Sequence, residues 1–202
     1  MSASASAKNS GNYNSALGYQ ALYSNTGGSF NSALGSSALY ANTTGSDNSA
    51  FGYFALRNHT TGSFNSAFGR AALNTNTTGG SNSAFGNYAL FLNTYGSSSS
   101  ALGYQALYSN QVASSTTAVG YQAARGTATY NNQGGVYLGV NAGYSAGTNS
   151  DYNTLLGYQA GYGITTGSNN IWIGTATSST AVANLTTGSQ NILIGNNISL
   201  PS

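Results

Sequence analysis

The chain is short of charge, cysteine and proline. Only 3% of its 202 residues are charged, whereas ordinary soluble domains carry about 25% charged residues. The absence of cysteine excludes disulfides and thiolate metal sites. A net charge of +2 without a basic cluster argues against nucleic acid and acidic membranes as partners. No apolar run approaches the roughly 18–20 residues that insertion into a membrane requires.

Side chains that perform catalysis are equally scarce. The two carboxylates, Asp47 and Asp151, belong to distant repeats and cannot act as a pair. The single histidine, His59, occupies a position that asparagine holds in other repeats, so we interpret it as a substitution in an asparagine column. Neither a phosphate-binding loop nor a calcium-binding glycine repeat occurs. The sequence therefore predicts a protein that is not an enzyme and holds no cofactor or metal.

What the chain has instead is a repeat of 17 residues, marked by a glycine in the frame Asn-Ser-Ala-Leu/Phe-Gly. So strict a period is typical of a stack of equivalent units that cover one another. The 16 tyrosines and 7 phenylalanines recur in phase with the repeat, which favours a folded stack over disorder. The last four marker glycines follow at intervals of 19, 18, 17 and 21 residues. The marker glycines are Gly18, Gly35, Gly52, Gly69, Gly86, Gly103, Gly120, Gly139, Gly157, Gly174 and Gly195.

Each repeat contains two strand-sized apolar runs and a Thr-Gly turn. Because a helix does not tolerate this much glycine, we predict an all-β parallel β-solenoid, or β-roll, of about eleven coils spaced about 4.8 Å apart. Columns of asparagine and threonine are expected to form hydrogen-bond ladders. Residues 1–13 are predicted to be a tail or attachment segment, residues 14–130 regular coils, and residues 131–202 irregular coils and the C-terminal end. Loops or widened turns are expected at 130–135 and 175–187.

The predicted strands carry apolar residues on both faces. The residues three and one before each marker glycine share a face, and the residue two before it points the other way. A single coil has one interior, so a second surface must cover the other face, most economically further copies of the chain in closed symmetry. We therefore expect an in-register homotrimer. The predicted seam residues, all two before a marker glycine, are Tyr137, Leu155, Trp172 and Leu193.

Two aromatic columns stand one and five residues after the marker glycine, the second also containing Arg57 and Arg125. Tyrosine beside asparagine and glutamine suits the binding of glycans and of proteins. The alternative is that the rings stack to stiffen the rod or fill the intersubunit seam. The candidate ligand or seam residues are Tyr19, Tyr23, Tyr40, Tyr53, Phe91, Tyr104, Tyr108 and Tyr121.

The Asn-Ser-Ala-Leu-Gly unit at 14–18 resembles the head repeat of trimeric autotransporter adhesins, whose heads are left-handed parallel β-rolls packed as homotrimers. Gly-Tyr-Gln-Ala-Leu-Tyr-Ser-Asn at 18–25 and 103–110, and Asn-Asn-Ile-Trp-Ile-Gly at 169–174, are similar to repeats of bacteriophage tail-fibre and large bacterial surface proteins. The resemblance covers about residues 14–197. The sequence shows no secretory signal in its first ten residues, and no stalk or anchor of the adhesin kind, so the virion fibre is favoured.

These patterns predict a structural fibre or adhesin shaft outside the cell, on a virion or a cell surface, that attaches to a host or surface through a glycan or receptor. An alternative is an extracellular filament of solenoids joined end to end, because solenoid ends expose unpaired strands. A third hypothesis is ice binding, since a flat array of hydroxyls and methyls could order water. The threonine column behind it consists of Thr26, Thr43, Thr60, Thr77 and Thr94.

Overall fold

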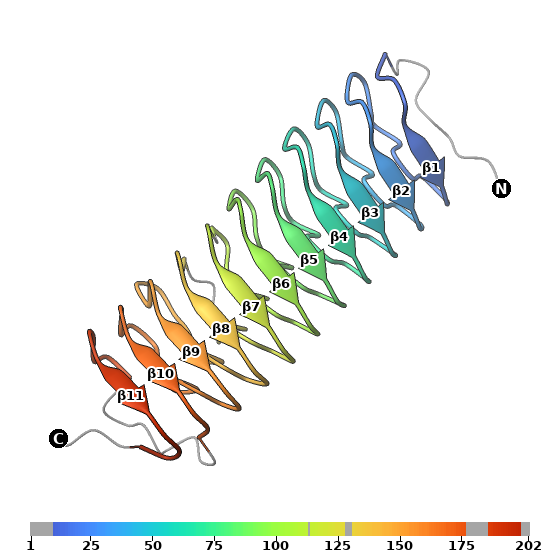
Figure 1. The fold of residues 1–202 in the computed structure, drawn as a ribbon. Helices are drawn as coiled ribbons and strands as arrows, with labels where there is room; N and C mark the ends of the chain where they lie inside the picture. Colours follow the sequence, from blue (N-terminus) through green and yellow to red (C-terminus); the bar gives the residue numbers. More distant parts are fainter. Residues whose placement is uncertain (1–9, 113, 128–130, 177–185, 199–202) are drawn as a thin grey trace.

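The computed structural model describes residues 10–112, 114–127, 131–176 and 186–198. In these residues eleven short strands form one parallel sheet in chain order, without any helix. Successive coils stack into a rod, and the chain runs from one end of it to the other (Figure 1). The strands are β1 (Ser15–Leu17), β2 (Ser32–Leu34), β3 (Ser49–Phe51), β4 (Ser66–Phe68), β5 (Ser83–Phe85), β6 (Ser100–Leu102), β7 (Thr117–Val119), β8 (Val136–Leu138), β9 (Thr154–Leu156), β10 (Ile171–Ile173) and β11 (Ile192–Ile194).

Equivalent residues of neighbouring coils lie opposite one another along the whole sheet. Ala16 pairs with Ala33 at one end, and Trp172 pairs with Leu193 at the other. The register also holds across the longer intervals, because the extra residues lie outside the strands. At a strand spacing of about 4.8 Å the sheet is about 48 Å long. The predicted parallel β-solenoid with a 17-residue repeat is confirmed. Of the two expected insertions, residues 130 and 177–185 lie outside the described residues.

The coil turns through residues with left-handed backbone. In the coil around Gly69, they are Ala71, Leu73 and Ser81, with φ of 54°, 51° and 59°. The same three positions are left-handed in most coils, and many hold side chains larger than glycine. Each such residue costs about 1 kcal/mol. Burial offsets this cost where the residue is leucine, since Leu73 and its equivalents in neighbouring coils are fully buried.

The interior lies behind the middle residue of each strand. In β4, Ala67 is buried while Ser66 and Phe68 are partly exposed. The late coils follow the same rule: Tyr137, Leu155 and Trp172 are 0% exposed and Leu193 is 2% exposed within a single chain. These four residues therefore form the core of the late coils, and their assignment to an intersubunit seam is wrong. The prediction that alternate strand residues face opposite sides was correct. Because both faces carry apolar residues, the sequence did not show which face points into the interior of the coil.

Asparagine ladders connect the coils in the interior. Asn48 Oδ1 accepts hydrogen bonds from the backbone nitrogen and the Nδ2 of Asn65, both at 3.0 Å. Asn65 Nδ2 also donates to Gly79 O at 2.9 Å. Each side chain thus satisfies a buried amide of the next coil and a carbonyl of the closing turn, groups that would be costly to bury without partners. The predicted asparagine ladder is present.

Candidate functional site

The outer face of the sheet carries an apolar column along its full length. The last residue of every strand is leucine, phenylalanine, valine or isoleucine, and its side chain is at least partly exposed. Phe51, Phe68 and Phe85 stack in the middle of this column, with ring centroids 4.7 and 4.8 Å apart. The first residue of each strand, on the same face, is serine or threonine in most coils and becomes isoleucine in β10 and β11. Neither column contains a charged residue.

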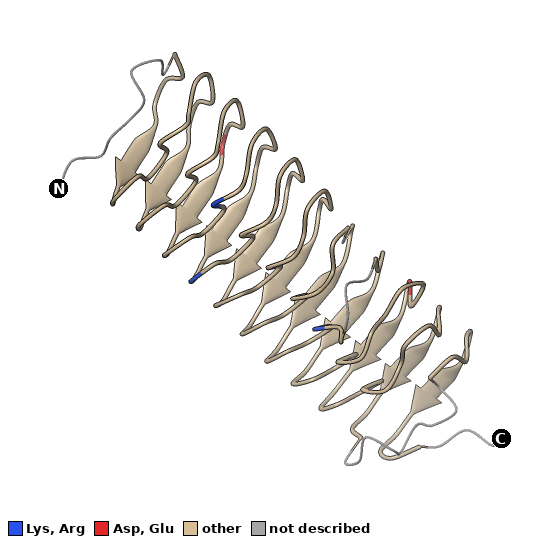
Figure 2. Ribbon diagram, turned by 180° about the vertical axis from the view of Figure 1, so that it is seen from behind, with Lys and Arg blue, Asp and Glu red and all other residues tan. Residues whose placement is uncertain are grey.

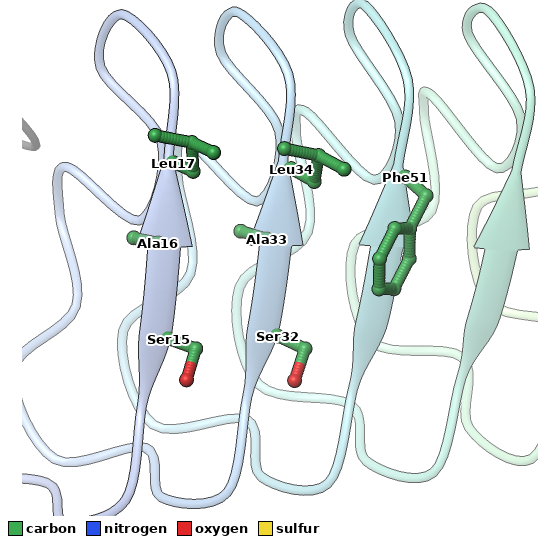
Figure 3. A pocket seen from close by; sticks show the side chains of 7 residues that line it. All are labelled: Ser15, Ala16, Leu17, Ser32, Ala33, Leu34 and Phe51. Atoms are coloured by element: carbon green, nitrogen blue, oxygen red, sulfur yellow. The ribbon is translucent and has the colours of Figure 1, made fainter. Parts of the chain in front are cut away.

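A hollow of about 240 Å³ interrupts this face at the N-terminal end of the rod. In Figure 3 the leucines and serines of β1 and β2 face one side, and Ala16 and Ala33 turn away from it. Phe51 of β3 borders the hollow. The hollow exists because the small serine column leaves room beside the leucines. It has no titratable side chain, so it offers a partner apolar contact and hydroxyl groups, and no chemistry.

The predicted ligand residues lie on a second surface, formed by the positions one, two and five after each marker glycine, which we call the aromatic flank. Their side chains are exposed or half-buried, and Tyr19 is 71% exposed. Tyr23 stacks on Tyr40 at 5.4 Å, and Tyr104 stacks on Tyr121 at the same distance. These rings belong to successive coils and are nearly parallel, so their faces cover one another. These stacked rings therefore present mainly their edges to solvent.

Three arginines connect the stacks where an aromatic column is interrupted. Arg57 lies 5.6 Å from the ring centroid of Tyr40 and 4.8 Å from that of Phe54. Arg125 likewise lies between Tyr108 and Tyr144, at 5.4 and 5.5 Å. Such cation–π contacts contribute about 0.5–1 kcal/mol each at exposed sites.

The third arginine and several rings were absent from the sequence prediction. Arg70 lies 5.8 Å from the ring of Tyr53 and 5.6 Å from that of Tyr88. Phe54 and Tyr88 belong to the position two after the marker glycine, which the sequence pattern left unassigned. Tyr144 stacks on Tyr162 at 4.8 Å. Counting five residues from Gly139 and Gly157 would have found these two.

The few charges are separated on the rod. Both acidic residues lie in the turns along one edge, and the arginines lie away from that edge (Figure 2). Asp151 Oδ1 accepts a hydrogen bond from the backbone nitrogen of Gln133 at 2.8 Å. Within the described residues, the guanidinium groups of the aromatic flank contact rings and polar neutral groups such as amide oxygens, and no carboxylate. That flank is consequently the positive side of the molecule.

His59 is buried within the second asparagine column. Its Nε2 lies 2.7 Å from Gly62 O, and its Nδ1 lies 3.2 Å from Asn76 Nδ2. Gly62 O can only accept, so His59 Nε2 carries the proton. Asn76 Nδ2, which also donates to Gly79 O, donates to His59 Nδ1. The ring thus has no donor left for the previous coil, and Asn42 Oδ1 is buried without a hydrogen bond. The predicted substitution in an asparagine column describes this geometry.

We expect His59→Asn to stabilise the protein by about 1 kcal/mol at neutral pH, because asparagine would donate to Asn42 Oδ1. Burial lowers the pKa of His59 from 6.5, although its hydrogen bonds with Gly62 and Asn76 act in the opposite direction. The native state therefore binds fewer protons than the unfolded state, and stability present above about pH 6.5 is lost as the pH falls. Urea unfolding at pH 7.5 and pH 5 should show the advantage of the variant growing at pH 5. A constant or reversed difference would contradict this account.

The threonine column uses its hydroxyl protons within the protein. Thr43 Oγ1 donates to Thr60 O at 3.0 Å, and Thr60 Oγ1 donates to Thr77 O at 2.9 Å. Thr26, Thr77 and Thr94 donate in the same way to the next coil. The predicted threonine ladder is present, and its donors are not free to order water. The ice-binding hypothesis depends on hydroxyl groups that can order water, so this geometry argues against it.

Comparison with known proteins gives no independent assignment. No protein-family model, curated protein or solved structure matches the chain. Within the described part of the chain, no group of three or more histidine, cysteine or acidic residues is placed to hold a metal ion. The same residues include no helix long and apolar enough to span a membrane. The two surfaces described above are therefore the candidates for function.

Proposed function

We propose that the chain is the non-enzymatic shaft of an extracellular fibre or adhesin, similar to a bacteriophage tail fibre, and that three copies pack in register around a common axis. The observation that carries the proposal is the uncharged apolar column on the outer face of the sheet. Fully burying one such leucine, isoleucine or phenylalanine side chain contributes about 1.5–3 kcal/mol. A column repeated over eleven strands offers enough of this energy to hold a shaft together, whereas a monomer would leave it in water.

The geometry of the face suits association with copies of itself. Each protomer presents the same flat column, so a rotation axis parallel to the rod brings identical residues together at every coil. The absence of charge on the column avoids repulsion between copies. The number three comes from the resemblance to the adhesin heads. The seam of this trimer is formed by the outward residues of the strands, Phe51, Phe68 and Phe85 among them.

We expect light scattering to give about three times the 20.4 kDa of one chain. Phe68→Asp should convert this species to monomers, because it places a carboxylate in the middle of the seam. Phe64→Asp is the matched control: Phe64 is 65% exposed, lies outside the strands, and occupies the position that Asp47 holds in the previous coil. Circular dichroism must show that both variants keep their β-structure. A wild-type monomer, or equal effects of the two substitutions, would refute the proposed seam.

A second function is favoured by the ends of the sheet. Among the described strands, β1 and β11 each pair with one neighbour, so each leaves a strand edge that another rod could extend. The chain would then be the unit of a continuous extracellular filament. Electron microscopy of the native source distinguishes the two functions. Discrete short fibres on phage particles support the shaft, and long unbroken threads support the filament.

A further inference from the structure

We propose that the aromatic flank binds an acidic polysaccharide that lies along the rod, with Arg57, Arg70 and Arg125 contacting its carboxylate or sulfate groups. This inference rests on the proposed attachment role, which places the protein, and therefore its ligand, outside the cell. It does not depend on the trimer, because the flank is separate from the outer face of the sheet.

The ring and guanidinium contacts form one unbroken series over nine coils, with every neighbour within 5.8 Å by the distances given above. Tyr88 joins the two halves, since it contacts Arg70 on one side and lies 5.5 Å from Phe91 on the other. The order of the series is Tyr23, Tyr40, Arg57, Phe54, Tyr53, Arg70, Tyr88, Phe91, Tyr108, Arg125, Tyr144 and Tyr162. A linear surface of this kind fits a linear ligand.

Three of the four cations of the chain lie on this flank, and both carboxylates lie at the opposite edge (Figure 2). The guanidinium groups are held between rings, so binding an anion costs little further ordering of side chains. Arg70 is exposed, and the contacts of its guanidinium in the described residues are with Tyr53 and Tyr88. Arg57 and Arg125 are four coils apart, about 19 Å along the rod.

The groups exposed on the flank determine which kind of polyanion fits it. Single-stranded nucleic acid binds by stacking its bases on exposed aromatic faces, but the stacked rings of this series cover one another, and guanidinium groups lie over Tyr40, Phe54, Tyr53 and Tyr88. Along the stacked part of the flank, the exposed groups are therefore mainly ring edges, phenol hydroxyls and glutamine amides. Gln122 Nε2 donates to Gln105 Oε1 at 2.7 Å, which places a second polar column beside Tyr104 and Tyr121. Hydroxyl and amide groups bind the hydroxyls of sugars, so an acidic polysaccharide satisfies both the charge and the hydrogen-bonding groups.

A purely structural role for the arginines makes a different prediction. If they only bridge the ring stacks, their removal should lower stability and leave a folded variant with unchanged ligand binding. Lysine in their place keeps the charge and a weaker ring contact. The two roles therefore separate when binding and unfolding are measured on the same variants.

The test uses the full chain and biotinylated heparin or alginate on a biosensor, with dextran as the neutral polymer. We expect binding to both acidic polymers, weakening with salt, and none to dextran. Changing the three arginines to glutamine should reduce the affinity about tenfold or more, while the triple lysine variant keeps most of it. Heparin and alginate together distinguish sulfate from carboxylate preference.

Relocating the charge is the decisive control. The triple glutamine variant with Thr44→Lys, Thr61→Lys and Thr78→Lys regains the wild-type net charge on exposed turns at the other edge. Recovery of binding in this variant, or equally tight binding of wild type to an oligothymidylate, would overturn the proposal. If the triple glutamine variant does not fold, Arg70→Gln alone should still weaken binding, because that side chain is exposed; no change would also overturn it. Loss of the trimer in Phe68→Asp should leave binding per chain intact, which separates this inference from the proposed assembly.

Discussion

Gly86→Ala is expected to lower the free energy of unfolding by about 3 kcal/mol or more, and to unfold the middle of the rod first. A Cβ at this position would lie 2.4 Å from Gly103 O and 2.7 Å from Gly103 C. Both atoms are backbone, so no side chain can move aside. The backbone at Gly86 has a φ of 140°, which only glycine adopts readily. The stack can accept the methyl group only by separating two coils.

Gly27→Ala is the matched control for this experiment. The nearest atoms to a Cβ at Gly27 are side-chain atoms of Thr44 and Ser10, at 3.8 and 3.9 Å. The equivalent position holds threonine in the following coils. Urea unfolding followed by circular dichroism should therefore show Gly27→Ala at or slightly above wild-type stability. If the two glycine variants unfold at similar urea concentrations, the close backbone approach is not what the marker glycines provide.

The second large effect is expected from Gly161→Leu, which should destabilise the protein by about 3 kcal/mol. A Cβ at Gly161 would lie 2.5 Å from Leu155 Cδ1. In the early coils the same two positions hold alanine in the strand and leucine across the interior, whereas this coil holds leucine in the strand and glycine across from it. The interior volume is thus kept by exchanging the large residue between the two sides.

A double-mutant cycle tests this exchange. Leu155→Ala alone should cost about 2–5 kcal/mol by leaving a cavity. The combination of Leu155→Ala with Gly161→Leu should cost at least about 2 kcal/mol less than the sum of the single changes, because it places alanine in the strand and leucine across the interior, as in the early coils. The left-handed backbone does not prevent this, since Leu107 occupies the equivalent position with a φ of 54°. Strict additivity of the two single changes would show that they do not share one interior space.

The repeat in the sequence predicted the stacking direction, the register and the ladders, because each depends only on identical residues recurring at one interval. The orientation of the strands could not be predicted in the same way. Trp172 is flanked by Ile171 and Ile173, so hydrophobicity alone does not tell which side is inside. The inner side is indicated by a compensation in side-chain size: a large residue in the strand lies opposite a glycine in the facing wall of the coil. Tyr137 faces Gly143, and Leu155 faces Gly161. Recognising it requires knowing that the two positions meet.

The aromatic flank was predicted in part. The columns one and five after the marker glycine contain the predicted tyrosines, which are exposed or half-buried as a surface requires. Phe54 and Tyr88 reach this surface because their backbone is left-handed, with φ near 61° for both. Large aromatic residues seldom adopt that conformation, so strand alternation and repeat spacing could not place them there.

The identical register of successive coils also bears on how the length of such a protein can change. A genetic duplication or deletion of one whole repeat within the regular part would keep every asparagine, threonine and glycine column aligned, because each coil contacts only its two neighbours. A fragment of a repeat would bring unlike residues opposite one another and break all columns at once. The late coils, with their own spacings and the Tyr137 and Trp172 cores, are not interchangeable in this way. Duplication or deletion of repeats can therefore lengthen or shorten the rod in steps of one coil, about 4.8 Å each, without any change to the coils at its ends.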